Sequence, residues 1–217
     1  VILNGVIVDS GYGLFGVEEI NITLRLFLTI GFIIFITNAY NLIDGLDGLA
    51  GSVALVISSF FTVWFYLNES YYLSIISIAT AGGIIGFLYF NWNPAKIFMG
   101  DTGALSLGFL FSVLSILFLN QNSSLTTEIH KFQSPVSAVA AILIFPLFDT
   151  IRIIIVRLVK KKSPFEPDKN HAHHVMMRLG LSHRQIALIV SISNILFIVL
   201  VIIFKDYADY ILLPTLI

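Results

Sequence analysis

Cysteine is absent from this 217-residue chain, and charged residues make up only 12% of it. Without cysteine, disulfides and thiolate metal sites are excluded. Soluble domains carry about 25% charged and about 45–50% apolar residues, whereas this chain is 57% apolar with a mean hydropathy of +0.93. The excess is too large for a bigger protein core, so we expect lipid as the solvent. The net charge of −1 argues against a nucleic-acid partner.

Long runs without a charged residue divide the sequence. They cover residues 26–43, 48–68, 70–95, 102–127, 132–148 and 185–204. A helix needs roughly 20 apolar residues to cross a bilayer core, and helices satisfy their own backbone polar groups in lipid. We therefore predict one all-α, polytopic membrane domain over residues 1–217, with about six spanning helices. Residues 206–217 would begin a partial seventh, and the strand-like composition of residues 1–8 favours an outer hairpin.

Lysine and arginine set the expected orientation. If the helices alternate, one side carries far more of these residues than the other, and that side should face the cytoplasm. The basic side holds Lys96, Arg157, Lys160, Lys161, Lys162, Lys169, Arg178 and Arg184, and the other side holds only Arg25, Lys131 and Lys205. The cytoplasmic connections would then be residues 38–51, residues 90–103 and a histidine-containing loop at residues 160–184.

The first connection, NAYNLIDGLDGLAG, contains Asp44 and Asp47. Carboxylates three residues apart repel each other unless a cation or a proton lies between them. The adjacent glycines let the backbone approach a ligand, although a solvated acidic turn fits the pattern equally well. Asn38 and Asn41 could ligate a hard cation or read a nucleobase edge, but hydrogen bonding to a neighbouring helix is the favoured interpretation for each alone.

The second connection, FNWNPAKIFMGDTG, combines Asp101, glycines and Lys96. Mg²⁺ takes oxygen ligands and shares them with substrate phosphates, and the free N–H groups of a helix start favour an anion. These residues therefore indicate a magnesium–phosphate site. The alternative is that Asp101 only caps the helix that it opens.

The third connection carries His171, His173 and His174 in the motif HAHH. On a helix, His171 and His174 would share a face and His173 would point elsewhere. Histidines can contact phosphate, and the spacing does not support a zinc site. A surface cluster without a role in binding is as well supported as phosphate binding. Ser182 with Gln185 has the spacing of a capping box for the last long helix.

Other polar residues carry weaker signals. Asp149 and Arg152 have the spacing of an ion pair on one helix, and both a structural role and substrate binding remain open. Gly180 would end a short helix that contains the histidines. His130 and His183 have no evident role.

Together, the stretches NAYNLIDGLDGLAG, FNWNPAKIFMGDTGALSLGF and NHAHH followed by RLGLSHRQ resemble the polyprenyl-phosphate N-acetylhexosamine-1-phosphate transferase family. The similarity runs in order and spacing over residues 38–184. Members of this family start O-antigen, enterobacterial common antigen and teichoic-acid linkage synthesis, and the translocase that makes lipid I is a relative. The resemblance implies a multi-pass enzyme of the bacterial inner membrane with its active site on the cytoplasmic face.

The resemblance also implies substrates and site residues. The substrates would be a UDP-N-acetylhexosamine and undecaprenyl phosphate, and the cofactor would be Mg²⁺ or Mn²⁺. The protein would be embedded in the lipid bilayer, and it could form a homodimer. Asp101 would be the metal ligand with Asn41 beside it, and Asp44 and Asp47 match carboxylates needed for activity. The residues expected to bind substrate are Asn38, Asn41, Lys96, His171, His173 and His174.

One departure from the family pattern is the lack of an adjacent aspartate pair, which relatives place on an earlier cytoplasmic loop. We expect the chain to begin after that loop, to lack the family's N-terminal helices and to be inactive alone. HAHH resembles the hexosamine branch, so we expect transfer of N-acetylglucosamine 1-phosphate with release of UMP. Direct attack and a covalent intermediate both remain open. The alternatives are lipid I synthesis from a peptide-bearing UDP-muramyl substrate, a transporter, and a non-catalytic remnant.

Overall fold

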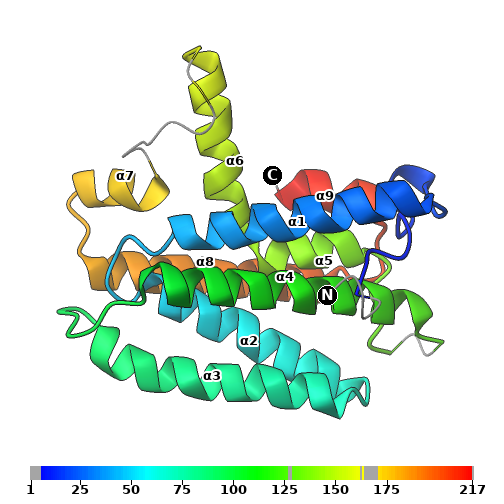
Figure 1. The fold of residues 1–217 in the computed structure, drawn as a ribbon, viewed down its shortest axis with the longest axis horizontal. Helices are drawn as coiled ribbons and strands as arrows, with labels where there is room; N and C mark the ends of the chain where they lie inside the picture. The colour runs from blue at the N-terminus through cyan, green and yellow to red at the C-terminus, as the bar shows by residue number, and fades with distance from the viewer. Residues whose placement is uncertain (1–5, 127–128, 162, 164–170, 217) are drawn as a thin grey trace.

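The computed structural model describes residues 6–126, 129–161, 163 and 171–216, and the regular elements in these ranges are all helical (Figure 1). This confirms the all-α prediction. The helices are α1 (Ile22–Leu42), α2 (Leu49–Leu67), α3 (Tyr71–Asn91), α4 (Gly100–Ser124), α5 (Pro135–Ile142), α6 (Ile144–Val159), α7 (Ala172–Arg178), α8 (His183–Ile203) and α9 (Asp209–Leu216), with a short 3-10 helix η2 (Leu14–Gly16). The hairpin expected at residues 1–8 is not formed at residues 6–8, and residues 1–5 lie outside the described ranges.

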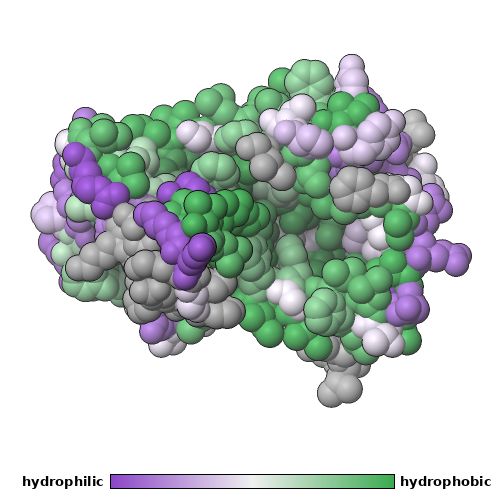
Figure 2. Space-filling model, turned by 90° about the horizontal axis from the view of Figure 1, so that it is seen from above, coloured by the Kyte–Doolittle hydropathy of each residue, from purple (hydrophilic) through white to green (hydrophobic). Residues whose placement is uncertain are grey.

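Among the residues that the structure describes, five helices, α1 to α4 and α8, are long and apolar enough to cross a membrane. The chain is therefore an integral membrane protein. Figure 2 shows hydrophobic side chains over much of the middle of the molecule, with hydrophilic residues gathered toward its two ends. The partial seventh helix corresponds to α9, which has eight residues.

The charge-free run at residues 132–148, expected to form one of the six spanning helices, is divided between two helices, and the number of spans in the described residues is five, or six if this bent pair counts as one. α5 ends at Ile142, and α6 leaves it at an angle of 84°, so this pair is a broken span or a re-entrant segment. Pro146 lies in the first turn of α6. Proline lacks a backbone N–H and its ring clashes with the preceding turn, which explains why the helix cannot continue straight through this point. In Figure 1, α6 projects away from the other helices.

The core forms where α2 packs against α3 and α8 and where α1 packs against α4. Aromatic side chains fill much of it, and Phe118 forms tilted or edge-on ring pairs with both Trp64 and Phe132. α1 and α4 approach each other closely at Gly108. A Cβ atom on Gly108 would lie 2.9 Å from Thr37 Cα and 2.9 Å from Tyr40 Cβ, so only glycine permits this crossing distance.

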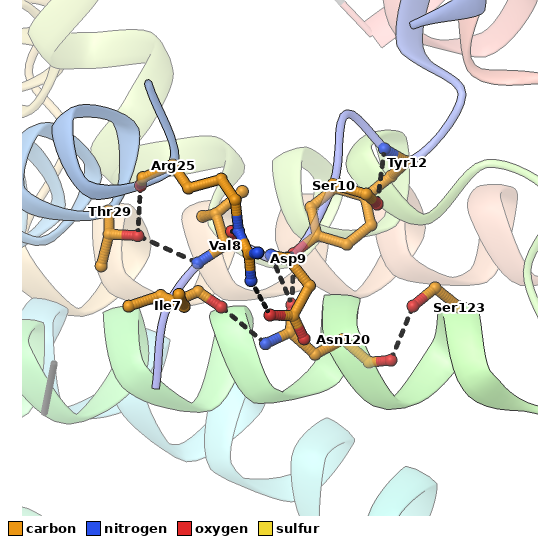
Figure 3. A network of polar contacts seen from close by, with 9 residues as sticks. All are labelled: Ile7, Val8, Asp9, Ser10, Tyr12, Arg25, Thr29, Asn120 and Ser123. Carbon is orange, nitrogen blue, oxygen red and sulfur yellow. Dashed lines mark hydrogen bonds and ion pairs between the residues drawn. The ribbon is translucent and has the colours of Figure 1, made fainter. Parts of the chain in front are cut away.

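A polar network fixes the N-terminal segment at the end of the bundle where α1 begins (Figure 3). The Val8 N–H donates to Thr29 Oγ1 at 2.9 Å, and Arg25 Nε donates to the Val8 carbonyl at 2.8 Å. Asn120 of α4 donates to the carbonyl of Ile7 at 2.7 Å. The segment therefore ties the start of α1 to the C-terminal half of α4.

We predict that Gly108→Ala lowers the free energy of unfolding by about 1–3 kcal/mol, because the added methyl group would overpack the α1–α4 crossing. A thermal melt of the purified protein in detergent measures this loss. Gly31→Ala is the matched control, since a Cβ at Gly31 of α1 has nothing within 4 Å. Equal melting temperatures for the two variants would contradict the close crossing.

Candidate active site

The turn between α1 and α2, which contains Asp44 and Asp47, is tied to the loop between α3 and α4. Gly48 adopts a left-handed conformation with φ +77 at the start of α2. Its N–H donates to Asn91 Oδ1 at 2.9 Å, and Asn91 Nδ2 donates to the carbonyl of Ile97 at 2.8 Å. Asn91 is only 4% exposed. One buried amide side chain therefore joins two connections that are far apart in the sequence.

Asp47 makes a second link to the same loop. It accepts hydrogen bonds from Asn93 Nδ2 at 2.9 Å and from the Ala95 N–H at 3.2 Å. His183 Nδ1 lies 3.4 Å from the carboxylate. Burial raises the pKa of Asp47, but the bonds from Asn93 and Ala95 and the nearby His183 outweigh it, so the pKa lies below its usual value. Asp47 is therefore ionised at neutral pH and occupied by donors of the protein.

Asp44 has the opposite environment. It is half-buried, accepts a hydrogen bond from the Gly100 N–H, and lies near enough to Asp101 for the two charges to interact. Burial raises its pKa, and the charge of Asp101 raises it further, while the Gly100 bond acts in the other direction. Asp101 is exposed in the first turn of α4, and the residue that precedes this helix, Met99, makes no side-chain cap. Two neighbouring carboxylates repel each other, and a cation between them would be stabilised by both.

The histidines lie against this turn. His171 has extended backbone angles (φ −55, ψ 151) and precedes α7. The prediction that His173 points away from His171 is therefore wrong, because His171 is not helical, and the two rings stack with centroids 5.6 Å apart. His173 is 1% exposed. A Cβ atom on Gly45 would lie 2.5 Å from His173 Nε2, so glycine at this position makes room for the imidazole.

Asp149 of α6 holds the start of the histidine helix. Its carboxylate lies 2.8 Å from His171 Nδ1 and accepts the Ala172 N–H at 2.7 Å. Arg152 donates to it at 2.8 Å, which confirms the predicted ion pair. Asp149 is 1% exposed. The contact with His171 was not predicted, because a separation of 22 residues leaves no local signal in the sequence.

The structure thus brings Asp44, Asp47, Asp101 and the three histidines to one end of the bundle. Asn41 adjoins them, and its carbonyl accepts the Asp44 N–H at 3.2 Å. Lys96 is exposed on the α3–α4 loop. Asn38 is also exposed, but its amide donates to the Ile34 carbonyl of its own helix at 2.7 Å.

Sequence reasoning missed several residues of this end. Asn91 and Asn93 bind the acidic turn, and His183, which had no evident role, contacts Asp47. Arg184 Nε donates to the carbonyl of Asn93 at 2.7 Å. Their side chains act across long sequence separations, although the asparagines stand within the motif FNWNPAKIFMGDTG, which had drawn attention to Asp101 and Lys96 alone.

No cluster of three or more histidine or carboxylate groups that could hold a metal is found among the described residues. The pair Asp44 and Asp101 offers oxygen ligands only, which suits Mg²⁺, since this ion keeps several waters and is commonly bound by one or two carboxylates together with substrate phosphates.

Comparison with known proteins identifies the family. The sequence model described as glycosyl transferase family 4 matches residues 1–119. The chain belongs to glycosyl transferase family 4. This confirms the resemblance seen in the motifs.

Three relatives illustrate how similar this family 4 chain is to known proteins. A probable undecaprenyl-phosphate N-acetylglucosaminyl 1-phosphate transferase of Bacillus subtilis is 38% identical over 82% of this chain and 48% of its own length. A decaprenyl-phosphate N-acetylglucosaminephosphotransferase of Mycobacterium leprae is 34% identical over 77% of this chain and 45% of its own length. A phospho-N-acetylmuramoyl-pentapeptide-transferase of Carboxydothermus hydrogenoformans is 31% identical over 81% of this chain and 48% of its own length. The chain spans about half the length of these relatives.

We predict that Asp149→Asn loosens the start of α7 in this family 4 protein. Charge-assisted hydrogen bonds contribute about 1.5–3 kcal/mol each, so amide deuterium exchange in α7 should become at least about tenfold faster. Mass spectrometry of peptides from α7 measures this. Asp206→Asn is the control, because Asp206 is 77% exposed. Unchanged exchange in Asp149→Asn would contradict the positioning role.

A second prediction concerns pH. Burial and the neighbouring His174 lower the pKa of His173 from 6.5 to about 4, with Asp149 opposing them. The unfolded state therefore binds more protons than the folded state between these values, so stability should rise with pH from about 4 to about 6.5. Melting temperatures across this window should fall toward low pH, and the fall should be smaller in His173→Phe. Equal slopes in the two proteins would contradict a buried, neutral His173.

Proposed function

We propose that the protein transfers N-acetylglucosamine 1-phosphate from UDP-N-acetylglucosamine to a polyprenyl phosphate, releasing UMP. The observation that supports this most is the convergence of the Asp44–Asp101 pair and the histidine helix at one end of a membrane bundle. A lipid acceptor and a water-soluble, polyanionic donor must meet at such a boundary. The names of the relatives from Bacillus and Mycobacterium supply the same substrate class.

In this reaction an oxygen of the polyprenyl phosphate forms a bond to the sugar-bearing phosphorus. The bond from that phosphorus to the bridging oxygen breaks, and UMP leaves with the electron pair. Phosphoryl transfer requires mainly positioning and charge stabilisation from the protein. Two phosphates of the donor and one of the acceptor must be brought together, so the site needs cationic and N–H groups.

Asp44 and Asp101 would hold Mg²⁺, or Mn²⁺ in its place, with Asn41 beside them. When bound, this ion would neutralise the diphosphate and the leaving UMP. Burial, and to a smaller degree the charge of Asp101, raises the pKa of Asp44, and a cation bound between the two carboxylates would offset both effects. The first turn of α4 adds backbone N–H groups and the positive end of the helix dipole.

The histidines would bind the donor phosphates and sugar. His173 Nδ1 is buried with no hydrogen-bond partner in the described part of the chain, so a bound substrate would supply one. Asp149 would keep His171 in place for the same purpose. Lys96 is exposed on the adjoining loop and would meet the diphosphate. Asp47, predicted to be catalytic, would instead hold the α3–α4 loop in place. Asn38, predicted to bind substrate, would line the path by which the substrate enters.

The excess of lysine and arginine near this end supports placing it in the cytoplasm, where nucleotide sugars are made. The membrane would then be the bacterial inner membrane. The second candidate function is transfer of a muramyl-pentapeptide phosphate, which the relative from Carboxydothermus favours. UMP release measured with each UDP-sugar in turn distinguishes the two functions.

We predict that Asp101→Asn lowers the rate of UMP release by about 100-fold or more, because loss of a metal-bound carboxylate removes several kcal/mol of charge stabilisation. The assay uses the complete protein in membranes with Mg²⁺, UDP-N-acetylglucosamine and polyprenyl phosphate. Asp206→Asn makes the same chemical change at an exposed position and should keep wild-type activity. Near-wild-type release by Asp101→Asn would rule out the metal-ligand role.

A further inference from the structure

α8 carries one polar residue on its buried face. Asn194 is 0% exposed, and every other buried residue of α8, a helix described from end to end, is apolar. The amide Nδ2 of Asn194 donates to the carbonyl of Ala141 at 3.1 Å and to the carbonyl of Ile142 at 3.2 Å. Both acceptors belong to the last turn of α5, directly before the bend into α6. Asn194 therefore contacts the backbone where the span is broken.

The carbonyl of Ile142 lacks the partner that a continuous helix would give it. In an α-helix it would accept the N–H of the residue four positions later. That residue is Pro146, which has no N–H. A backbone carbonyl without a donor is unfavourable in a membrane span, because lipid offers none. Asn194 supplies a donor from α8, which packs against α5, and so replaces the N–H that the proline lacks.

An asparagine in a membrane helix commonly does no more than join two helices, and such bonds contribute about 0.6–2 kcal/mol. Burying an amide is unfavourable when one of its groups stays unpaired. The Oδ1 atom of Asn194 is buried without a hydrogen-bond partner among the described residues. Leucine has a similar branched shape and no such oxygen, so packing alone would favour leucine here. The feature that distinguishes the amide from leucine is its pair of bonds to the break.

The angle at the break determines whether Asp149 reaches the histidine helix. Asp149 is the sixth residue of α6, so it lies about 7.5 Å along the helix from its start. A change of about 10° in the bend would move this position by about 1.3 Å. The distances of 2.7 Å to the Ala172 N–H and 2.8 Å to His171 Nδ1 would then exceed those at which hydrogen bonds form.

We propose that Asn194 is a positioning residue of the active site: it fixes the α5–α6 bend so that Asp149 holds α7 where its histidines bind the nucleotide sugar. This inference rests on the proposed function, and it adds a residue outside the site on which donor binding depends. Asn194 is the twelfth of the 21 residues of α8. It lies in the middle of a spanning helix, so it acts through Asp149 rather than by touching the substrate.

A double-mutant cycle tests whether Asn194 acts through Asp149. UMP release by the complete protein in proteoliposomes is measured with either the UDP-N-acetylglucosamine or the polyprenyl phosphate concentration varied. We expect Asn194→Leu to raise KM for the nucleotide sugar by about tenfold, the effect of losing about 1.4 kcal/mol of binding, and to leave KM for the polyprenyl phosphate unchanged. Asp149→Asn should have a similar effect. The double variant should match Asp149→Asn alone, because both changes break one connection, whereas independent effects would multiply to about 100-fold.

Amide deuterium exchange measures the same coupling without substrate. Exchange in α7 should become about tenfold faster in Asn194→Leu, as predicted for Asp149→Asn, and no faster in the double variant. Exchange in α3, which packs chiefly on α2, should stay unchanged. Ser191→Ala is the control, because it removes a hydroxyl one turn earlier on α8 that is buried without a hydrogen-bond partner in the described part of the chain. This variant should match wild type in both measurements.

Unchanged donor KM and unchanged α7 exchange in Asn194→Leu would overturn the positioning role. A 100-fold effect in the double variant would also overturn it, as would equal rises in both KM values, because Asn194 would then act independently of Asp149 or on the bundle as a whole. If the leucine variant does not accumulate in the membrane, Asn194→Ala removes the amide without added bulk and gives the same comparison.

Failure of the proposed function is a separate result, in which the wild-type protein would release no UMP from UDP-N-acetylglucosamine. The exchange measurements need no substrate. They would therefore still decide whether Asn194 positions α7 through Asp149.

Discussion

The arrangement of this site depends on hydrogen bonds that join two connections at a membrane boundary. Asn91 bridges the Gly48 N–H and the Ile97 carbonyl, and Asp47 accepts donors from Asn93 and Ala95. Irregular backbone near lipid must find partners within the protein. These side chains supply them, so the acidic turn and the start of α4 hold a fixed distance. The position of Asp44 relative to Asp101 therefore depends on these hydrogen bonds.

The same turn gives its two aspartates opposite properties. Asp47 is surrounded by donors, which lower its pKa, while Asp44 is half-buried beside another carboxylate, which raises its pKa. Environments that push the pKa values of paired groups apart commonly separate their roles. Here the separation distinguishes a carboxylate already satisfied by the protein from one whose charge still needs a partner. The second kind is the one that a substrate-bound cation can use.

The sequence predicted those features that local chemistry controls. Charge-free runs predicted the long helices because lipid leaves few other structures, and Ser182 with Gln185 forms the expected capping box at α8. Gly180 follows α7 with φ +91, as a helix-ending glycine should. The bridges from Asn91 to Gly48 and from Asp149 to His171 could not be predicted, since neither partner lies within a helical turn of the other. The prediction that His171 lies on a helical face with His174 was wrong for a similar reason, because the contact with Asp149 places His171 before the start of the helix.

The break between α5 and α6 has a consequence for the site. A straight helix through Pro146 would continue along the direction of α5 and carry Asp149 with it. With a bend of 84°, α6 instead departs from the bundle, and Asp149, near its start, reaches His171 and the Ala172 N–H. The histidine helix is thereby anchored to the bundle while Gly45 admits His173 against the acidic turn. The break beside Pro146 therefore also determines where the histidine helix α7 is held.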